Sequence, residues 1–96
     1  MWQNKYIMVR TYSAGVFVGD FESIEEDIIV LKNARRIWYW SGAASLSQLA
    51  VDGPSDPKNC KFPCPVDLIQ LFNVIEIIEV TDIARRKIGN VKIWEF

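Results

Sequence analysis

The sequence predicts an α+β fold. We expect a small, strongly bent antiparallel sheet or partly open β-barrel of about five to six strands, with two short helices at about residues 42–51 and 82–88. Short runs rich in β-branched and aromatic residues recur along the chain and alternate with turn-forming residues. Two segments place apolar residues at helical spacing after a capping residue. The 96 residues match the length of a single domain, residues 1–96.

A β-hairpin is predicted near the N-terminus. Tyr6–Thr11 and Val16–Phe21 have the composition of strands, and Tyr12–Gly15 supplies the turn between them. Gly19 within the second strand indicates a bulge or a close backbone approach. The acidic segment 22–27 is typical of a solvated turn.

The next segment allows two interpretations. Ile28–Leu31 predicts a short buried strand, and residues 35–40 alternate, which places Arg35 and Arg36 on opposite faces. Asn33 lies between these two runs and is a frequent turn residue. The sequence therefore predicts either two strands joined at Asn33 or one long bent strand.

The first helix is predicted to begin after Ser41, a favoured N-cap residue, and to extend over residues 42–51. Leu46, Leu49 and Ala50 have helical spacing, and the following Gly53-Pro54 pair ends the helix. Residues 52–65 contain four prolines and predict a loop.

The C-terminal third predicts a strand, a helix and a last strand. Residues 66–80 read as strand with a bulge or with both faces buried. Thr81 is expected to cap a helix over residues 82–88 that Gly89-Asn90 ends. Val91–Phe96 alternates and is expected to form the closing strand.

Composition argues against most enzymatic functions. The chain has no histidine, which excludes Ser-His-Asp and Cys-His nucleophilic dyads and most common metal triads. It also lacks a glycine-rich phosphate loop, and we expect no cofactor. The acidic cluster Glu22, Glu25, Glu26 and Asp27 leaves a small carboxylate hydrolase as an alternative, although such clusters are usually solvated turns.

Charge and cysteine content bound the partners and the compartment. The net charge of −1 disfavours nucleic acid as a partner. Neither a signal peptide nor a membrane span is predicted, which favours the cytoplasm. Cys60 and Cys64 are expected to be reduced thiols there; half a zinc site, completed by a symmetric dimer, is the minor alternative. The high apolar content favours a homo-oligomer.

Residues 32–50 concentrate the side chains best suited to binding. Arginine binds phosphate in a bidentate fork, tryptophan stacks on bases, and a helix N-terminus receives anions. The same residue types anchor protein interfaces, and they also occur as ordinary core with arginines paired to the acidic segment 22–27. The candidate ligand-binding residues are Arg10, Tyr12, Ser13, Arg35, Arg36, Trp38, Trp40, Ser41, Gly42 and Ser45.

Several stretches together resemble a known family. They are VRTYSAGV (residues 9–16), KNARRIWYW (32–40), GAASLSQLA (42–50), NCKFP (59–63) and IEII (75–78). The chain thereby resembles a family of small proteins of tailed bacteriophages and prophages that is carried as a domain of unknown function. The resemblance implies an accessory, non-virion protein acting in the cytoplasm of the infected host bacterium, and it implies no catalytic residue or cofactor.

Two functions follow as expectations. The first is a non-enzymatic module that binds a small anionic or nucleotide-like ligand or a host factor, by analogy with anti-defence proteins that sequester nucleotides. It predicts that Arg35, Arg36 and Trp40 converge on a pocket at the helix start. The second is an adaptor or inhibitor that binds a host or phage protein, which predicts a flat or convex exposed patch.

Overall fold

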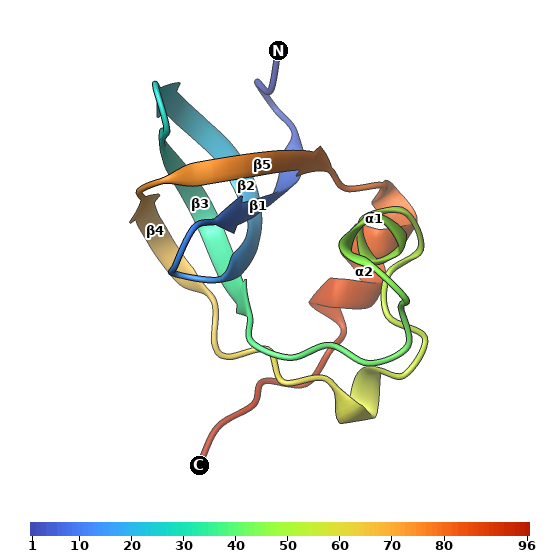
Figure 1. Cartoon of the computed structure of the whole chain (residues 1–96). Coiled ribbons are helices and arrows are strands. Elements are labelled where there is room, and N and C mark those ends of the chain that lie inside the picture. Colours follow the sequence, from blue (N-terminus) through green and yellow to red (C-terminus); the bar gives the residue numbers. More distant parts are fainter.

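The computed structural model describes residues 1–96 as a five-stranded antiparallel sheet with two helices beside it (Figure 1). The spatial order of the strands is β4-β3-β2-β1-β5, and the sheet is bent but not closed. The predicted α+β class is therefore confirmed. The elements are β1 (Tyr6–Thr11), β2 (Val16–Glu25), β3 (Ile28–Ile37), α1 (Leu46–Asp52), the 3-10 turn η1 (Pro57–Asn59), β4 (Val66–Leu71), β5 (Val74–Glu79) and α2 (Asp82–Gly89).

The two edge strands of the sheet follow each other directly in the chain. β4 pairs only with β3 and β5 only with β1, although a short turn at Phe72-Asn73 joins them. Asn73 adopts a φ of 58°, a left-handed conformation that asparagine tolerates better than most residues. This connection brings the edges near each other without pairing them, which gives the partly open barrel.

Irregularities in β2 and β3 bend the sheet. The register between these strands shifts between Val18 and Asp20, opposite Asn33, whose φ is 51°. A Cβ on Gly19 would lie 3.0 Å from the Lys32 carbonyl oxygen, so the predicted close backbone approach is present. Of the two interpretations of residues 28–40, one long bent strand is right, but it ends at Ile37.

Apolar side chains form two cores, one on each face of the sheet. The first fills the inside of the bend between the strands and comprises Ile7, Val9, Phe17, Ile29, Leu31, Ala34 and Leu71. The second lies between the outer face and the helices and comprises Met8, Val18, Ile37, Leu49, Ala50, Cys60, Phe62, Val80, Ala84, Ile88 and Val91. In Figure 1 both helices accordingly lie to one side of the sheet.

The helix starts test the capping predictions. Thr81 caps α2 as expected, since its hydroxyl oxygen accepts a hydrogen bond from the Ala84 N–H at 3.1 Å. The start predicted for the first helix was wrong. Ser45 caps α1 by accepting from the Gln48 N–H at 3.1 Å, while the Ser41 side chain bonds elsewhere. Residues 42–45 are therefore loop.

The strand predictions for the C-terminal third were partly wrong. Residues 66–80 form two strands rather than one. Val91–Phe96 is not a strand, because its pairing is limited to a single parallel bridge between Ile93 and Phe62. The Val91 carbonyl accepts a hydrogen bond from Arg35, and the Trp94 N–H donates to the Phe62 carbonyl. The segment therefore packs against a loop and not against a sheet edge.

Candidate functional site

Arg35, the central residue of the predicted site, is a structural clamp. Only 6% of it is exposed, and its guanidinium donates to the carbonyl oxygens of Pro63 (3.1 Å), Ile88 (2.9 Å), Phe62 (3.2 Å) and Val91 (2.8 Å). Desolvation by burial lowers its pKa from the ordinary value. The clamp ties β3 to the end of α2, to the segment after α2 and to residues 62–63, which precede β4. Few of its donors remain for a ligand.

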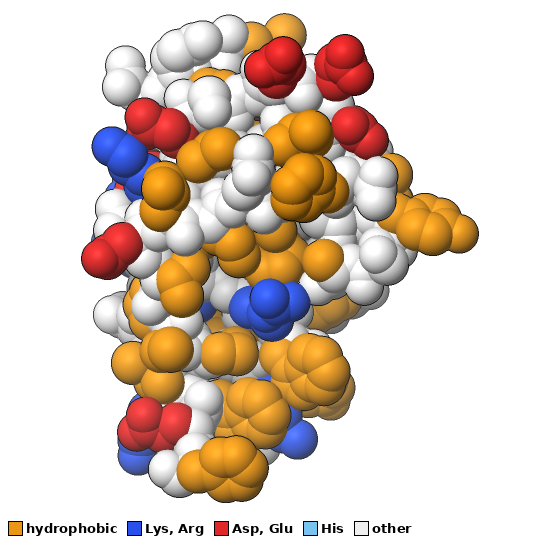
Figure 2. All heavy atoms as spheres, turned by 90° about the vertical axis from the view of Figure 1, so that its left-hand side faces the viewer, with side chains coloured by type: hydrophobic (Ala, Val, Ile, Leu, Met, Phe, Trp, Pro, Cys, Tyr) orange, Lys and Arg blue, Asp and Glu red, His pale blue; other side chains and the backbone are white.

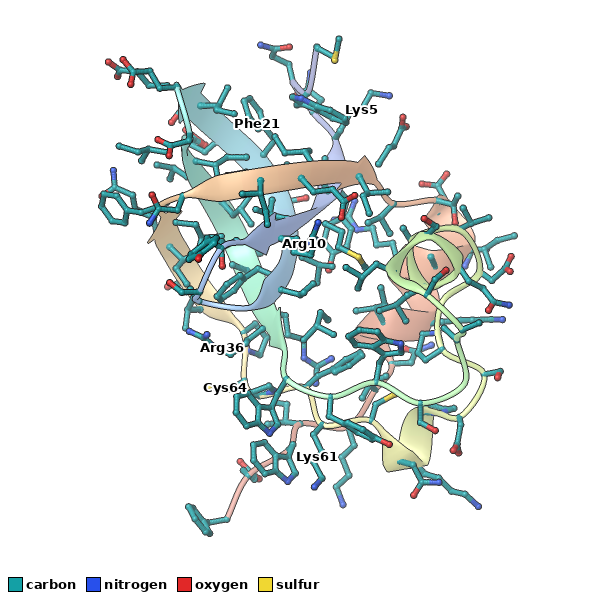
Figure 3. All side chains as sticks on the ribbon, in the orientation of Figure 1. Lys5, Arg10, Phe21, Arg36, Lys61 and Cys64 are labelled. Carbon is teal, nitrogen blue, oxygen red and sulfur yellow. The ribbon has the colours of Figure 1, made fainter.

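Arg36 points to the opposite face of β3, as the alternation predicts. It is exposed, its guanidinium carbon lies 4.4 Å from the Phe17 ring centroid, and it donates to the Ala14 carbonyl at 2.8 Å. With Cys64 it borders a hollow of about 210 Å³ whose other walls are mainly apolar (Figure 3). Arg36 is thus the one residue of the predicted ligand-binding set that lines a hollow.

The hairpin residues of the predicted site lie apart from Arg35. Arg10 forms an ion pair with Glu76 on the neighbouring strand β5, with 3.0 Å between Nε and Oε1. Tyr12 and Ser13 are exposed in the β1–β2 turn. No hydrogen bond or ion pair joins these three side chains to the segment after β3.

The residues around the predicted helix start hold a loop together. The Ser41 hydroxyl donates to Asp56 at 2.8 Å, and hydrogen bonds from Asn59 and Ser41 lower the pKa of Asp56. Gly42 has a φ of 89°, and a Cβ there would lie 2.4 Å from the Asp56 nitrogen. Trp40 is half-buried against the outer core, and its indole N–H donates to the Ala43 carbonyl at 3.3 Å.

Arg35, Arg36 and Trp40 therefore do not converge on a pocket in this structure. The alternative that arginines pair with the acidic segment 22–27 is wrong for both Arg35 and Arg36, because both donate to backbone carbonyls. Glu22 forms its ion pair with Lys32 instead. The N-terminus of α1 is also occupied, since Ser45 accepts from the Gln48 N–H and the Gln48 side chain accepts from the Ala44 N–H at 2.7 Å.

Two tryptophans outside the core form the most distinctive surface feature. Trp38 is 63% exposed and Trp94 47% exposed, yet their rings are parallel within 5°, with centroids 6.5 Å apart. That geometry lies in the range of offset aromatic stacking. Trp38 follows β3, whereas Trp94 belongs to the segment that Arg35 holds, so two distant parts of the chain build one surface.

Tyr39 and Lys61 extend this surface. Their main chains exchange two hydrogen bonds, at 3.2 Å and 2.7 Å, and Tyr39 is exposed. The Lys61 ammonium lies 5.9 Å from the Tyr39 ring centroid and 5.7 Å from that of Trp94, within cation–π range. We call Trp38, Tyr39, Lys61 and Trp94 the aromatic surface; hydrophobic side chains gather at the same, lower end of the molecule in Figure 2.

Sequence reasoning included Trp38 but missed Trp94 and Lys61. The sequence places Trp94 in the predicted closing strand, where an aromatic side chain is expected to belong to the sheet. A signal was nevertheless present, because the alternation of residues 91–96 places Trp94 on the same face as Lys92, which marks a solvated face. The stacking of the two indoles could be found only from the fold.

The two cysteines occupy different surroundings. Cys60 is buried, burial raises the pKa of its thiol, and its sulfur accepts from the Ser41 N–H at 3.4 Å. Cys64 is exposed and borders the hollow beside Arg36. No group of three or more histidine, cysteine or acidic side chains lies together, so the zinc alternative finds no further ligands within the chain.

The fold and surface define a class: a small α+β domain with a bent, open antiparallel sheet and an exposed aromatic surface at one end. The chain belongs to a family described as a domain of unknown function, DUF6948, which it matches over residues 4–88. No curated protein matches it. Neither helix has the length and apolar character needed to cross a bilayer.

Proposed function

We propose that this protein is a non-enzymatic interaction module that binds another protein through the aromatic surface. The observation that carries the proposal is the stacked Trp38–Trp94 pair, which remains largely exposed although both core clusters are complete without it. Tryptophan is among the residue types that contribute most to protein interfaces, with losses of about 2 kcal/mol or more on truncation.

The shape and fixation of the surface also favour a protein partner. The main chain fixes both indoles. Trp38 directly follows the last residue of β3, and the backbone N–H of Trp94 donates to the Phe62 carbonyl at 3.0 Å. A surface fixed in this way loses little conformational entropy on binding. Lys61 adds a charge at its centre that fits a partner carrying carboxylates.

A small anionic ligand is less well supported. The side chains expected to hold it are engaged within the protein, since Arg35 donates to four backbone carbonyls and Arg10 pairs with Glu76. Arg36 retains free donors, but the hollow beside it has mainly apolar walls. The proposal therefore places the function in the exposed aromatic residues. From the family resemblance, we propose the cytoplasm of a phage-infected bacterium as the setting.

Site-specific photo-crosslinking tests the proposal. A photoreactive phenylalanine analogue at position 38 keeps an aromatic ring in the surface. We expect it to give a discrete protein adduct in cells that produce the protein, and Trp94→Ala in the same chain is expected to abolish the adduct. The matched control is the same analogue at Ile83, an equally apolar and exposed residue on α2.

The outcome separates the two functions. Adducts that form equally from positions 38 and 83, or that persist in the Trp94→Ala background, would refute the aromatic surface as a binding site. Thermal denaturation with a panel of linear and cyclic nucleotides provides the complementary measurement. A ligand that binds only the folded chain raises its melting temperature by mass action, so an increase lost in Arg36→Met would favour the ligand instead.

A further inference from the structure

The opposite end of the molecule carries a surface of complementary chemistry. A hollow of about 260 Å³ lies between the β2–β3 turn and β5. Apolar and acidic side chains line it together. We call it the acidic hollow, lined by Ile24, Val74, Ile75, Ile77, Glu26, Asp27 and Glu76. Ile24 and Ile75 remain substantially exposed although they are β-branched aliphatic residues.

The charges of the acidic hollow are largely uncompensated within the chain. Glu26 and Asp27 take part in none of the four ion pairs of the structure, and only Glu76 has a basic partner, Arg10. Figure 2 shows acidic side chains at the upper end of the molecule next to hydrophobic ones. A surface of this kind fits a partner that presents aromatic and basic side chains together.

The aromatic surface presents that combination. Lys61 lies over its rings, and Lys58 and Lys92 border the neighbouring hollow that Trp94 also lines. None of these three lysines forms an ion pair. The lysines at the aromatic surface therefore have no carboxylate partner, and Glu26 and Asp27 of the acidic hollow have no basic one. Both surfaces also leave apolar side chains exposed.

We propose that the partner of the aromatic surface is a second copy of this chain, whose acidic hollow receives it head to tail. This inference rests on the proposed function and names its partner. The β2–β3 turn and the C-terminal segment lie at opposite ends of the molecule in Figure 1. The contact joins two different surfaces, so each added copy leaves one of each free, and the assembly grows into a filament or closes into a ring.

Sedimentation velocity of the full chain over a wide concentration range tests the inference. The wild-type protein is expected to form species larger than a dimer at low salt, and about 0.5 M salt is expected to weaken them because it screens the lysine–carboxylate attraction. Two variants each disable one surface. Glu26→Gln with Asp27→Asn alters the acidic hollow, and Lys61→Gln with Trp94→Ala alters the aromatic surface. Asp52→Asn with Asp67→Asn is the control, because it makes the same charge change as the first variant outside both surfaces.

The decisive sample is an equimolar mixture of the two variants. Each variant alone is expected to associate at least about tenfold more weakly than the wild type. The mixture is expected to form a dimer and nothing larger, because one intact aromatic surface can meet one intact acidic hollow. If each surface instead met its own counterpart across a two-fold axis, mixing the two variants would not restore association. A mixture that forms no dimer therefore overturns the proposal.

Two further outcomes also overturn it: a wild-type protein that is monomeric at every concentration, and a control variant that loses association to the same extent as the acidic variant. Circular dichroism spectra identical to wild type establish that the variants are folded. Crosslinking from position 38 separates failure of the inference from failure of the proposed function. An adduct with a different protein, together with a monomeric chain, would leave the interaction module intact and refute self-association alone.

Discussion

Replacing Arg35 by methionine is expected to remove a large part of the stability of this protein. The substitution keeps an unbranched apolar stem and deletes the guanidinium. Of the buried carbonyls that lose the guanidinium, those of Phe62 and Ile88 keep a backbone donor, the N–H of Trp94 and of Val91, whereas the Val91 carbonyl is left without a donor. An unsatisfied buried acceptor costs about 1–3 kcal/mol. The other three lost hydrogen bonds cost about 0.5–1.5 kcal/mol each. Relief of guanidinium desolvation and entry of water offset part of the total, which leaves a loss of about 2–4 kcal/mol.

Urea denaturation followed by circular dichroism measures the effect. Small domains have a total stability of about 5–15 kcal/mol, so a loss of this size shifts the midpoint strongly. Arg36→Met is the matched control, because the neighbouring arginine makes one exposed hydrogen bond and one contact with a ring. We expect it to cost less than about 1.5 kcal/mol.

Arg35→Lys separates charge from geometry. Lysine keeps the positive charge, but its three donors share one atom and cannot reach four carbonyls spread around a planar fork. We expect Arg35→Lys to lower the free energy of unfolding, but by less than Arg35→Met does. If Arg35→Met and Arg36→Met change the free energy of unfolding by the same small amount, the clamp does not hold the C-terminal segment and the reasoning is refuted.

Three more predictions concern the rest of the chain. Gly42 has a φ of 89°, and a Cβ there would lie 2.4 Å from a backbone nitrogen. Gly42→Ala is therefore expected to lower the free energy of unfolding, measured by chemical denaturation, by at least about 2 kcal/mol. Burial raises the pKa of Tyr6 to about 12 from 10.0; the folded state therefore holds its proton longer, and stability falls as pH rises through that window, which pH-dependent denaturation measures. Iodoacetamide is expected to label exposed Cys64 and spare buried Cys60, as read by peptide mass.

Each of these has an internal comparison. Gly15 also has a positive φ, 103°, but a Cβ there would meet no atom within 4 Å. If Gly15→Ala and Gly42→Ala lower the free energy of unfolding equally, the close Asp56 backbone is not the cause. In Tyr6→Phe the fall in stability between about pH 10 and 12 is expected to shrink, and an unchanged fall would assign it to other groups. Equal labelling of both cysteines would contradict the burial of Cys60.

The elements of this fold could be predicted where local pattern determines them. Alternation predicted the first hairpin and the opposed faces of Arg35 and Arg36, and turn residues predicted the end of α1 at Gly53. Local pattern does not say which face becomes core, and so it could not tell that Arg35 is the buried arginine. That choice depends on the carbonyls of Ile88 and Val91, which the fold brings to β3.

The wrong predictions share a physical cause: residues with equal local propensity compete for one role. Ser41 and Ser45 are equally good caps, and the position of Asp56 decides between them because it accepts from Ser41. Val91–Phe96 has a strand-like composition, but strand formation needs a free partner edge in register. The candidate site was misplaced for the same reason, because the contact between Trp38 and Trp94 exists only in three dimensions.

The clamp at Arg35 also links recognition to folding. It secures the segment that carries Trp94, so the aromatic surface exists only while that segment is docked. Any partner that recognises both indoles binds the native chain and not the unfolded one. At a concentration of about a hundred times its Kd, such a partner raises the free energy of unfolding by about 2.7 kcal/mol. An occupied assembly would therefore tolerate mutations, such as Arg35→Lys, that leave the isolated chain marginal.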